Sequence, residues 1–398
     1  MTRNRHLVAA PDKFRGTASS SQVCAAVLRA AEAAGWSASA YPAADGGEGT
    51  LEALGGEPRH SEVVGPLGDP VVAEWRMFTS GPIAALTLGN PPTLGNPPTL
   101  GNPPTLGNPP TLGNPPTLGN PPTLGNPQAL EPRPNGPVAV IEMARCSGLA
   151  LAGGAERNDP VTASTAGVGQ LIAQAVAAGA TQVVVTCGGS ASTDGGWGAL
   201  EALGLPPRLE GVDLVAAYDV EARFVEAATL FAPQKGATVE QVGTLERRLR
   251  LLADRYERRH GTDVRSLTGG GAAGGLAGGL SVLGARLVPG FGLVAEATGL
   301  ARALVGADLV VTGEGYLDRQ SLGGKVVGGV LDLAARAGVP VLVVVGDADP
   351  AVVTEVRRDH PGTSVLSLTA LVGRDRSMSS PLAAIESVVT RHLAAMAS

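Results

Sequence analysis

Lysine, cysteine and aromatic residues are all scarce in this chain of 398 residues. Only three of its 30 Lys and Arg residues are lysines, and aromatic residues make up 3% of the chain. A net charge of −6, with no basic stripe interleaved with aromatics, argues against a nucleic-acid partner. Cysteines occur only at Cys24, Cys146 and Cys187, an odd number at wide spacings that indicates reduced thiols rather than a disulfide scaffold.

Long apolar runs are missing as well. No segment approaches the roughly 18 apolar residues of a membrane-spanning helix, and residues 1–14 lack the apolar stretch of a signal peptide. We therefore expect a cytoplasmic protein without a membrane partner. The five histidines are scattered, without the spacing of a zinc site. A hydrophobic content of 44% with 17% charge is typical of a globular chain, and the length suggests about two domains.

Glycine and proline are abundant, with 56 and 31 residues. Much of the proline lies at 87–128, where six copies of Thr-Leu-Gly-Asn-Pro-Pro precede one Thr-Leu-Gly-Asn-Pro-Gln. This repeat has no charged or aromatic residue, and its Pro-Pro pairs block helix formation, so we expect a disordered loop. The favoured interpretation is a tolerated loop expansion, because loop closure entropy grows slowly with length. A proline-rich docking tract is the alternative.

The remaining sequence alternates between strand and helix patterns, which predicts an α/β fold. Continuous apolar runs between helices indicate a parallel sheet that is covered on both faces. We predict strands at 7–10, 71–78, 138–143, 182–187, 308–312, 339–345 and 364–368, and helices at 19–34, 165–178, 239–260 and 326–337. The strands at 71–78 and 138–143 flank the repeat.

Many glycines outside the repeat gather in four segments, at 46–49, 188–198, 269–279 and 313–329. At least two segments follow a predicted strand and lead into a helix, which is where open α/β sheets bind ligands. Glycine lets backbone N–H groups approach an anion, and nearby Asp, Glu and Lys side chains suit a magnesium-bound polyphosphate. For any single segment, tight turns and close helix packing are an equally good explanation.

Three common motifs do not account for these segments. The chain has no Gly-x-x-x-x-Gly-Lys-Ser/Thr sequence, which argues against a P-loop enzyme. Gly269–Gly274 fits Gly-x-Gly-x-x-Gly, but the strand before it is poor and no suitable acidic residue follows. The segment at 188–192 lacks the second glycine of a nucleophile elbow.

Six motifs, in order along nearly the whole chain outside the repeat, resemble the glycerate kinase family of the bacterial two-domain type, similar to glycerate 2-kinases. They are Ala10–Thr17 (APDKFRGT), Ala44–Thr50 (ADGGEGT), Gly188–Gly196 (GGSASTDGG), Pro233–Ala237 (PQKGA), Gly270–Gly275 (GGAAGG) and Thr312–Lys325 (TGEGYLDRQSLGGK). The resemblance implies ATP- and Mg²⁺-dependent phosphorylation of glycerate, usually to 2-phosphoglycerate. Glycerate and ATP are then the small-molecule partners.

The resemblance also implies two α/β domains with the active site in the cleft. A discontinuous Rossmann-like domain is expected at 1–64 and 288–398. A second α/β domain, at 65–287, is inserted in it and carries the repeat loop at 87–128. The sequence does not indicate an oligomeric state.

Candidate site residues come from the motifs. As catalytic residues we expect Asp194, Asp45 and Lys235, with a carboxylate acting on the substrate hydroxyl. Asp45, Asp194, Glu314 and Asp318 are the candidates to hold Mg²⁺. The substrate- and phosphate-binding candidates are Asp12, Lys13, Arg15, Gly46, Gly47, Ser190, Ser192, Gln320 and Lys325. The nucleotide-binding candidates are Gly270, Gly271, Gly274, Gly313, Glu314 and Gly315. All three lysines of the chain lie in these motifs.

The chain departs from the family pattern at several positions. Tyr316 stands where Arg usually follows Gly-Glu-Gly, Val326 where proline follows Gly-Lys, and Arg15 where lysine is commoner. The stretch that keeps Asp219 lacks the usual Asn and Pro. Since Tyr offers one hydroxyl where Arg offers a bidentate charged fork, another arginine is needed for the substrate carboxylate. Candidates to compensate are Arg15, Arg223 and Arg319.

Two alternative functions therefore stay open beside glycerate phosphorylation. The first is a kinase for another small hydroxy acid, which the loss of the Arg at Tyr316 suggests. The second is a catalytically decayed kinase that acts as a binding or scaffold protein through its Pro-rich repeat. The retained carboxylates and lysines argue against decay.

Overall fold

The structure, a computed structural model, describes residues 5–80, 83, 136–205 and 209–397, and the predicted repeat loop at 87–128 lies outside them. The described residues form two β-sheets with helices packed on them. The predicted α/β class is therefore confirmed. None of the described helices is both long and apolar enough to cross a lipid bilayer.

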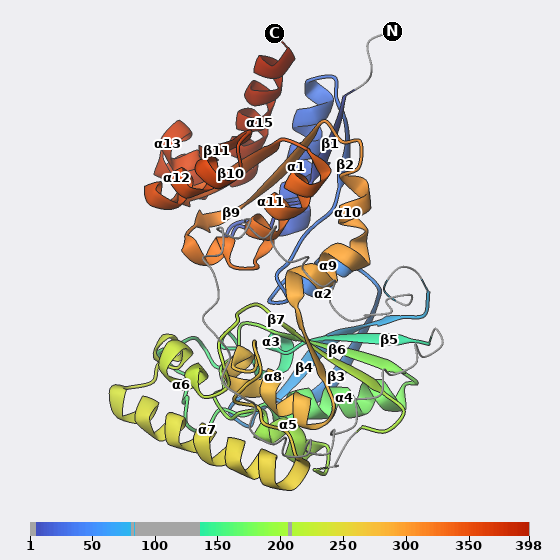
Figure 1. The fold of residues 1–398 in the computed structure, drawn as a ribbon, viewed down its shortest axis with the longest axis vertical. Coiled ribbons are helices and arrows are strands. Elements are labelled where there is room, and N and C mark those ends of the chain that lie inside the picture. Colours follow the sequence, from blue (N-terminus) through green and yellow to red (C-terminus); the bar gives the residue numbers. More distant parts are fainter. Residues whose placement is uncertain (1–4, 81–82, 84–135, 206–208, 398) are drawn as a thin grey trace, which may run out of the picture. The chain divides into compact units, whose positions relative to one another are not determined.

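Both ends of the chain contribute to a five-stranded parallel sheet in the order β11-β10-β9-β1-β2. Its strands are β1 (His6–Ala9), β2 (Ser37–Ala40), β9 (Leu309–Leu317), β10 (Val341–Ala348) and β11 (Thr363–Ser367). Leu7 pairs with Leu309, so the blue and orange segments lie side by side in Figure 1. The sheet thus joins the N-terminal motif to the C-terminal one.

Helices cover both faces of this sheet because successive strand residues point to opposite sides. Leu7 and Ala9 pack with α1 (Ser20–Ala33) and α15 (Pro381–Ala397), whereas Val8 and Val310 pack with α9 (Gly290–Thr298), α11 (Val326–Ala337) and α12 (Pro350–Asp359). The chain therefore leaves β1 and β9, which are neighbours, toward opposite faces. This reversal is the topological switch point at which open α/β sheets bind ligands.

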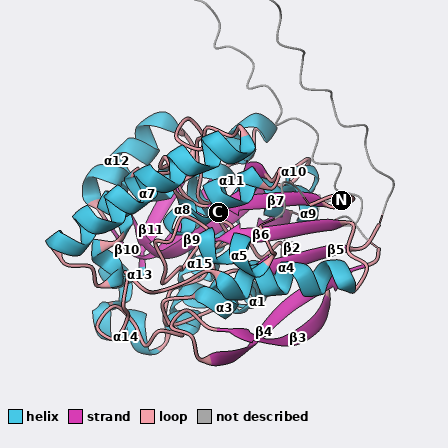
Figure 2. Cartoon of the chain, turned by 90° about the horizontal axis from the view of Figure 1, so that it is seen from below, coloured by secondary structure: helices cyan, strands magenta, loops and turns pink. Residues whose placement is uncertain are grey.

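The second sheet has six strands in the order β3-β4-β5-β6-β7-β8. Its strands are β3 (Glu57–Val64), β4 (Pro70–Phe78), β5 (Val138–Glu142), β6 (Gln182–Cys187), β7 (Asp213–Tyr218) and β8 (Arg286–Pro289). The pairs β3–β4 and β4–β5 are antiparallel, and the others are parallel. Figure 2 shows β3 and β4 at one edge of this sheet.

The main core of the second sheet lies under its long helices. These are α4 (Ala166–Ala177), α7 (Val239–His260) and α8 (Ala272–Val282), with the shorter α5 (Trp197–Ala202). On α7, Leu245 and Leu249 are fully buried, and Val242 and Leu252 pack against the same core. The remaining helices are α2 (Thr50–Leu54), α3 (Ala144–Ser147), α6 (Glu226–Phe231), η1 (Pro233–Lys235), α10 (Leu300–Ala303), η2 (Arg319–Leu322), α13 (Leu368–Val372) and α14 (Arg374–Ser379).

The predicted elements are all present, and β6, α7 and α11 begin and end as predicted. Strands β2, β3, β7 and β8 were not predicted from the sequence. Strand β3 belongs to the six-stranded sheet, although the predicted domain boundary assigned residues up to 64 to the other domain. Since the contacts group residues 1–86 and 136–398 into one compact unit, the domain boundaries stay a prediction.

Deleting residues 87–128 should leave stability and activity close to those of the full chain. Strands β4 and β5 pair directly, Phe78 with Val138, and residues 79–86 and 129–137 would still connect them. Loop closure depends only weakly on loop length, so little free energy is at stake. The check is the melting temperature and turnover of the deletion variant beside a variant with a Gly-Ser linker of equal length. Loss of activity in both variants would show that the repeat itself is needed.

Candidate active site

Four carboxylates lie at the carboxyl ends of parallel strands from both sheets. Asp12 follows β1, and its backbone N–H donates to Gly313 O of β9 at 2.8 Å, beside Glu314. Asp45 follows β2, and Asp219 follows β7 of the other sheet. Asp12, Asp45 and Glu314 were predicted site residues, and the structure brings them together at the switch point. Asp219 was not among the predicted site residues.

Burial and mutual repulsion shift the pKa values of three of these carboxylates. Burial, with the charge of Asp45 as the next cause, raises the pKa of Asp12 to about 6 and that of Asp219 to about 7. Burial raises the pKa of Glu314 to about 7, with Asp12 among the contributing charges. A raised pKa stabilises the folded state at low pH, and this stabilisation is lost as the pH rises through about 6 to 7. The site therefore favours a bound cation at neutral pH.

Asp219 interacts electrostatically with all three lysines of the chain. Lys325 and Lys13 both lower the pKa of Asp219, and the charges of Asp194 first and Asp219 second favour the charged form of Lys235. Lys13 Nζ donates to Glu48 O at 2.6 Å, and Lys325 stands at the N-cap of α11. The structure thus gathers lysines from positions 13, 235 and 325 around one carboxylate.

Lys235 lies in a polar pocket of its own. It is 3% exposed, and its Nζ donates to Ser190 Oγ at 2.7 Å and to Ser192 O at 2.6 Å. Burial lowers the pKa of this ammonium to about 8. The hydroxyls of Ser192 and Thr193 are buried and find no hydrogen-bond partner in the described part of the chain. A buried cation beside spare hydroxyl groups is suited to an anion such as a phosphate.

Glycine allows the two sheets' loops to approach one another here. A Cβ added at Gly188 would lie 2.5 Å from Gly47 Cα and 3.1 Å from Asp219 Oδ2. A Cβ added at Gly46 would lie 2.8 Å from Gly290 Cα. Because no side chain intervenes, the segment that carries Asp45 packs directly against the ends of β6 and β8. The predicted role of Gly46 and Gly47 in phosphate binding stays a prediction.

The carboxylate of Asp194 faces hydrogen-bond donors of the protein and not an open site. Its Oδ2 accepts from Thr165 N and Thr165 Oγ1, both at 2.8 Å, and from Gly198 N at 3.2 Å. Its Oδ1 accepts from Gly196 N at 3.1 Å. These bonds tie the starts of α4 and α5 together, which favours a structural role. The predicted catalytic and Mg²⁺ roles of Asp194 stay untested predictions.

Three further predicted residues, Asp318, Arg319 and Gln320, make contacts within the protein. Asp318 caps η2, accepting from the backbone N–H groups of Gln320 at 2.8 Å and Ser321 at 3.1 Å. Gln320, a predicted substrate-binding residue, therefore contacts Asp318 through its backbone N–H group. Arg319, a candidate for the substrate carboxylate, forms an ion pair with Glu355 at 3.2 Å.

Several predicted nucleotide-binding glycines lie where backbone packing is tight. A Cβ at Gly271, Gly274 or Gly313 would overlap Arg223 O, Ser192 O or Val344 O respectively. At Gly270 it would lie 3.1 Å from Leu267 O, and at Gly315 it would lie 3.4 Å from Arg15 N. Close packing accounts for Gly271, Gly274 and Gly313, as the sequence-based alternative allowed, whereas the contact at Gly315 is an ordinary one. The role of these glycines toward a nucleotide stays a prediction.

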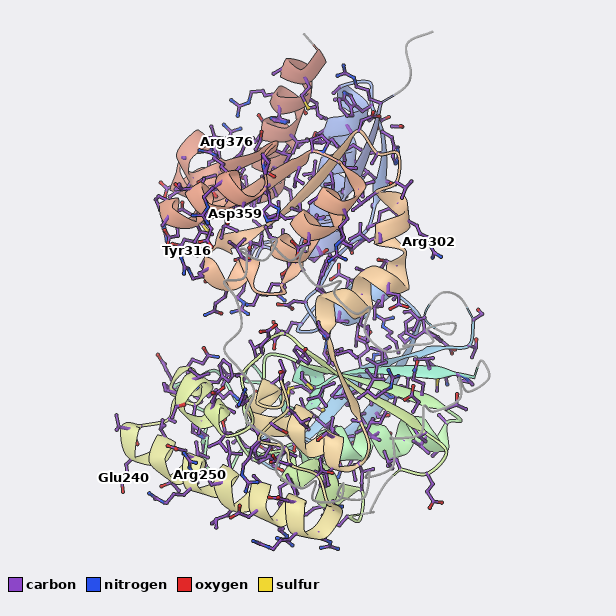
Figure 3. All side chains as sticks on the ribbon, in the orientation of Figure 1. Glu240, Arg250, Arg302, Tyr316, Asp359 and Arg376 are labelled. Atoms are coloured by element: carbon purple, nitrogen blue, oxygen red, sulfur yellow. The ribbon has the colours of Figure 1, made fainter. Side chains whose placement is uncertain are left out.

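A cavity of about 740 Å³ opens beside Asp12. One wall is formed by residues 12–20 with Glu48, Gly49 and Glu52, and a second wall comes from the six-stranded sheet and α3, with His60, Glu74, Glu142 and Arg145. Lys13 and Arg15, two predicted substrate-binding residues, line it. Tyr316 does not line this cavity, and its side chain is 55% exposed (Figure 3). The cavity is large enough for a small organic acid.

The carboxylates suit Mg²⁺ in its usual protein environment. Within the described ranges, no three His, Cys, Asp or Glu side chains form a ready set of metal ligands. Glu314 Oε1 is nevertheless buried without a hydrogen-bond partner among the described residues. Magnesium is commonly held by one or two carboxylates together with substrate phosphates and water. Asp45, Asp219 and Glu314 offer such hard oxygen ligands beside the lysines.

The chain is similar in sequence and in fold to known proteins. The model of the glycerate kinase family matches residues 7–89, 128–206 and 204–397, and so leaves out most of the repeat. The chain is 32% identical to a glycerate kinase of Halalkalibacterium halodurans, covering 85% of each chain. It is 31% identical to the glycerate 2-kinase of Escherichia coli, covering 92% of this chain and 91% of the relative. A Salmonella typhimurium LT2 crystal structure, assigned as a candidate glycerate kinase 2, is similar with a TM-score of 0.69 and 26% identity over 99% of this chain and 98% of that one.

Proposed function

Since the chain belongs to the glycerate kinase family, we propose that it transfers the γ-phosphoryl group of ATP to the C2 hydroxyl of glycerate. The products are 2-phosphoglycerate and ADP. The observation that carries this proposal is the gathering of all three lysines of the chain around carboxylates at the switch point. Phosphoryl transfer depends mainly on positioning and on neutralising phosphate charge, and this arrangement offers both.

The lysines are assigned to the phosphate groups. Lys325 precedes α11, a helix of 12 residues whose N-terminus attracts anions, and Gly323 and Gly324 lie just before it. Lys235 and Ser190 offer a buried ammonium and hydroxyl to the transferred group. Bound Mg²⁺, held by Asp219 or Glu314 and by the phosphates, would neutralise charge that develops on the phosphate oxygens.

Asp45 is assigned to the substrate hydroxyl. Its side chain is 8% exposed, and Gly47 N donates to Oδ1 at 3.1 Å, which fixes the carboxylate and leaves Oδ2 for a ligand. The hydroxyl oxygen attacks the γ-phosphorus while the bond from that phosphorus to the bridging oxygen breaks, and ADP leaves. The hydroxyl proton passes to Asp45 Oδ2. Asp12, whose Oδ1 accepts from its neighbour Lys13 N at 2.7 Å, orients the acceptor from the same edge of the sheet.

The proposal is tested by the release of ADP. Purified protein with ATP, Mg²⁺ and D-glycerate should release ADP well above a blank without glycerate, and ³¹P NMR should show 2-phosphoglycerate. Chelation of Mg²⁺ should abolish turnover. Folded protein that releases no ADP with D-glycerate would contradict the proposal. Turnover with a different hydroxy acid would favour the first alternative, and ATP binding without any turnover would favour the scaffold alternative.

A further inference from the structure

Glu142 forms a buried link between the two walls of the cavity. It is the last residue of β5 and is 1% exposed. Its Oε1 accepts from Leu51 N of α2 at 2.9 Å, and its Oε2 accepts from Arg145 Nε at 3.1 Å. A buried carboxylate is costly unless both oxygens are satisfied. These two partners satisfy them, so the position of Arg145 is determined by the fold.

Arg145 keeps its terminal nitrogens for another partner. Only Nε is engaged by Glu142, and the side chain is 47% exposed on the wall of the cavity. No hydrogen bond from its two terminal NH₂ groups to another described residue is present. A guanidinium held through Nε presents a planar pair of N–H donors that matches a carboxylate.

Five acidic side chains (Asp12, Glu48, Glu52, Glu74 and Glu142) and three cations (Lys13, Arg15 and Arg145) line the cavity, so an anion is favoured only beside these cations. Among its acidic residues, Glu52 accepts from Ser19 Oγ at 2.7 Å, and Glu74 pairs with Arg76 at 2.5 Å. Arg15 lines the same cavity and forms no ion pair within the described part of the chain. Arg15 and Arg145 therefore supply positive charge that the protein itself does not fully neutralise.

We infer that Arg145, positioned by Glu142, binds the carboxylate of the hydroxy-acid substrate, with Arg15 as the second cation of this subsite. The inference rests on the proposed function. In-line transfer requires the acceptor and the leaving group on opposite sides of the phosphorus. Lys235, Lys325 and Ser190 do not line the cavity, whereas Asp12 and Lys13 connect it to the carboxylates. The acid thus enters through the cavity, and the nucleotide lies on the side of Lys235 and Lys325.

This subsite also accounts for the departure at Tyr316. That side chain is 55% exposed on β9 and lies outside the cavity lining, so it does not supply the charge for substrate binding. Arg145, which lines the cavity, supplies this positive charge instead. A bidentate contact between Arg145 and the substrate would select a carboxylate over an uncharged group. Loss of such a charged contact weakens binding by roughly 10- to 100-fold.

The test compares R145Q, E142Q and a control, R250Q. Arg250 forms a similar ion pair with Glu246 on α7 and is labelled in Figure 3. We expect R145Q to raise the KM for D-glycerate by roughly 10- to 100-fold while the KM for ATP stays within about twofold. E142Q should raise the KM for glycerate by a smaller factor with little change in kcat, as befits a positioning residue. R250Q should match the wild type.

Specificity gives a second readout. R145Q should reduce the preference for glycerate over uncharged glycerol, whereas a merely structural defect would lower turnover of both. An unchanged KM for glycerate in folded R145Q, or a raised KM for ATP alone, would overturn the inference and leave the proposed function standing. If the wild type releases no ADP with glycerate, the proposed function fails instead. Calorimetric binding of D-glycerate then decides, and equal binding, or none, to wild type and R145Q would overturn the inference.

Discussion

Replacing Asp45 with asparagine should lower kcat for phosphoryl transfer by about 10²- to 10⁴-fold, the usual contribution of a positioned acid–base group. Asparagine keeps the shape of the side chain and its acceptor for Gly47 N, so the loop should keep its conformation. It removes the negative charge that would take the hydroxyl proton. Single-turnover kinetics with D-glycerate, beside the unfolding curve of the variant, measure both effects. Turnover near that of the wild type would exclude this role for Asp45.

The folded state of D45N should become more stable in the absence of ligands. The charge of Asp45 raises the pKa values of Asp12 and Asp219, and a raised pKa means that stability is lost as the pH rises through about 6 to 7. Removing that charge reduces the loss at neutral pH. A melting temperature that rises by a few degrees while turnover collapses is the pattern of a site built for function.

Asp194→Asn is the matched comparison because Asp45 and Asp194 both precede a pair of glycines in the sequence. Four hydrogen bonds from Thr165, Gly196 and Gly198 fill the acceptors of Asp194, and an asparagine NH₂ would face at least one donor. Loss of such buried bonds costs about 1–3 kcal/mol, so D194N should unfold more easily. Unchanged stability of D194N, together with a kcat as low as that of D45N, would instead support a catalytic role for Asp194.

The different environments of Asp45 and Asp194 show what the sequence could not provide. Both follow the same pattern, an aspartate beside paired glycines, and that pattern fits a ligand loop as well as a helix start. Which of the two applies to Asp194 depends on Thr165, which is 29 residues away in the sequence and contacts Asp194 only after α4 and α5 have packed. Local sequence therefore located the loop but not the direction of its carboxylate.

Asp219 and Arg145 were missed for related reasons. Asp219 follows the short segment Asp213–Tyr218, whose pattern is not strongly strand-like. Strand β7 was therefore not predicted, and Asp219 was not recognised as lying at a strand end. Arg145 stands beside a predicted strand end, but its role depends on the contact of Glu142 with Leu51 N, which joins positions 91 residues apart. In contrast, the lysines can be predicted as site residues from their scarcity, since a chain with three lysines places all of them in motifs, and their roles stay a prediction.

Gly188→Ala should lower kcat/KM by at least about 10²-fold without removing any reactive group. The added Cβ would lie 2.5 Å from Gly47 Cα, a backbone atom, and 3.1 Å from Asp219 Oδ2. Gly188 is not among the glycines with positive φ, so alanine is compatible with its backbone conformation and the effect is steric. The loop that carries Asp45 and Gly47 must move away from the end of β6, and the carboxylate of Asp219 must shift as well. A displacement of about 1 Å in a phosphoryl-transfer site is enough to cost about 10²-fold.

Graded glycine variants separate this effect from a general loss of stability. A Cβ at Gly47 would lie 3.1 Å from Asp45 Oδ1 and 3.9 Å from Gly188 Cα, so G47A should be milder than G188A. Gly292, an exposed residue of α9, has nothing within 4 Å of an added Cβ, and G292A should behave as the wild type. Circular dichroism confirms folding, and kcat/KM ranks the variants. If folded G188A has the same kcat/KM as G292A, the close contact between Gly188 and Gly47 does not position Asp45 and Asp219. The proposed roles of Asp45 as the base and Asp219 as a Mg²⁺ ligand would then be contradicted.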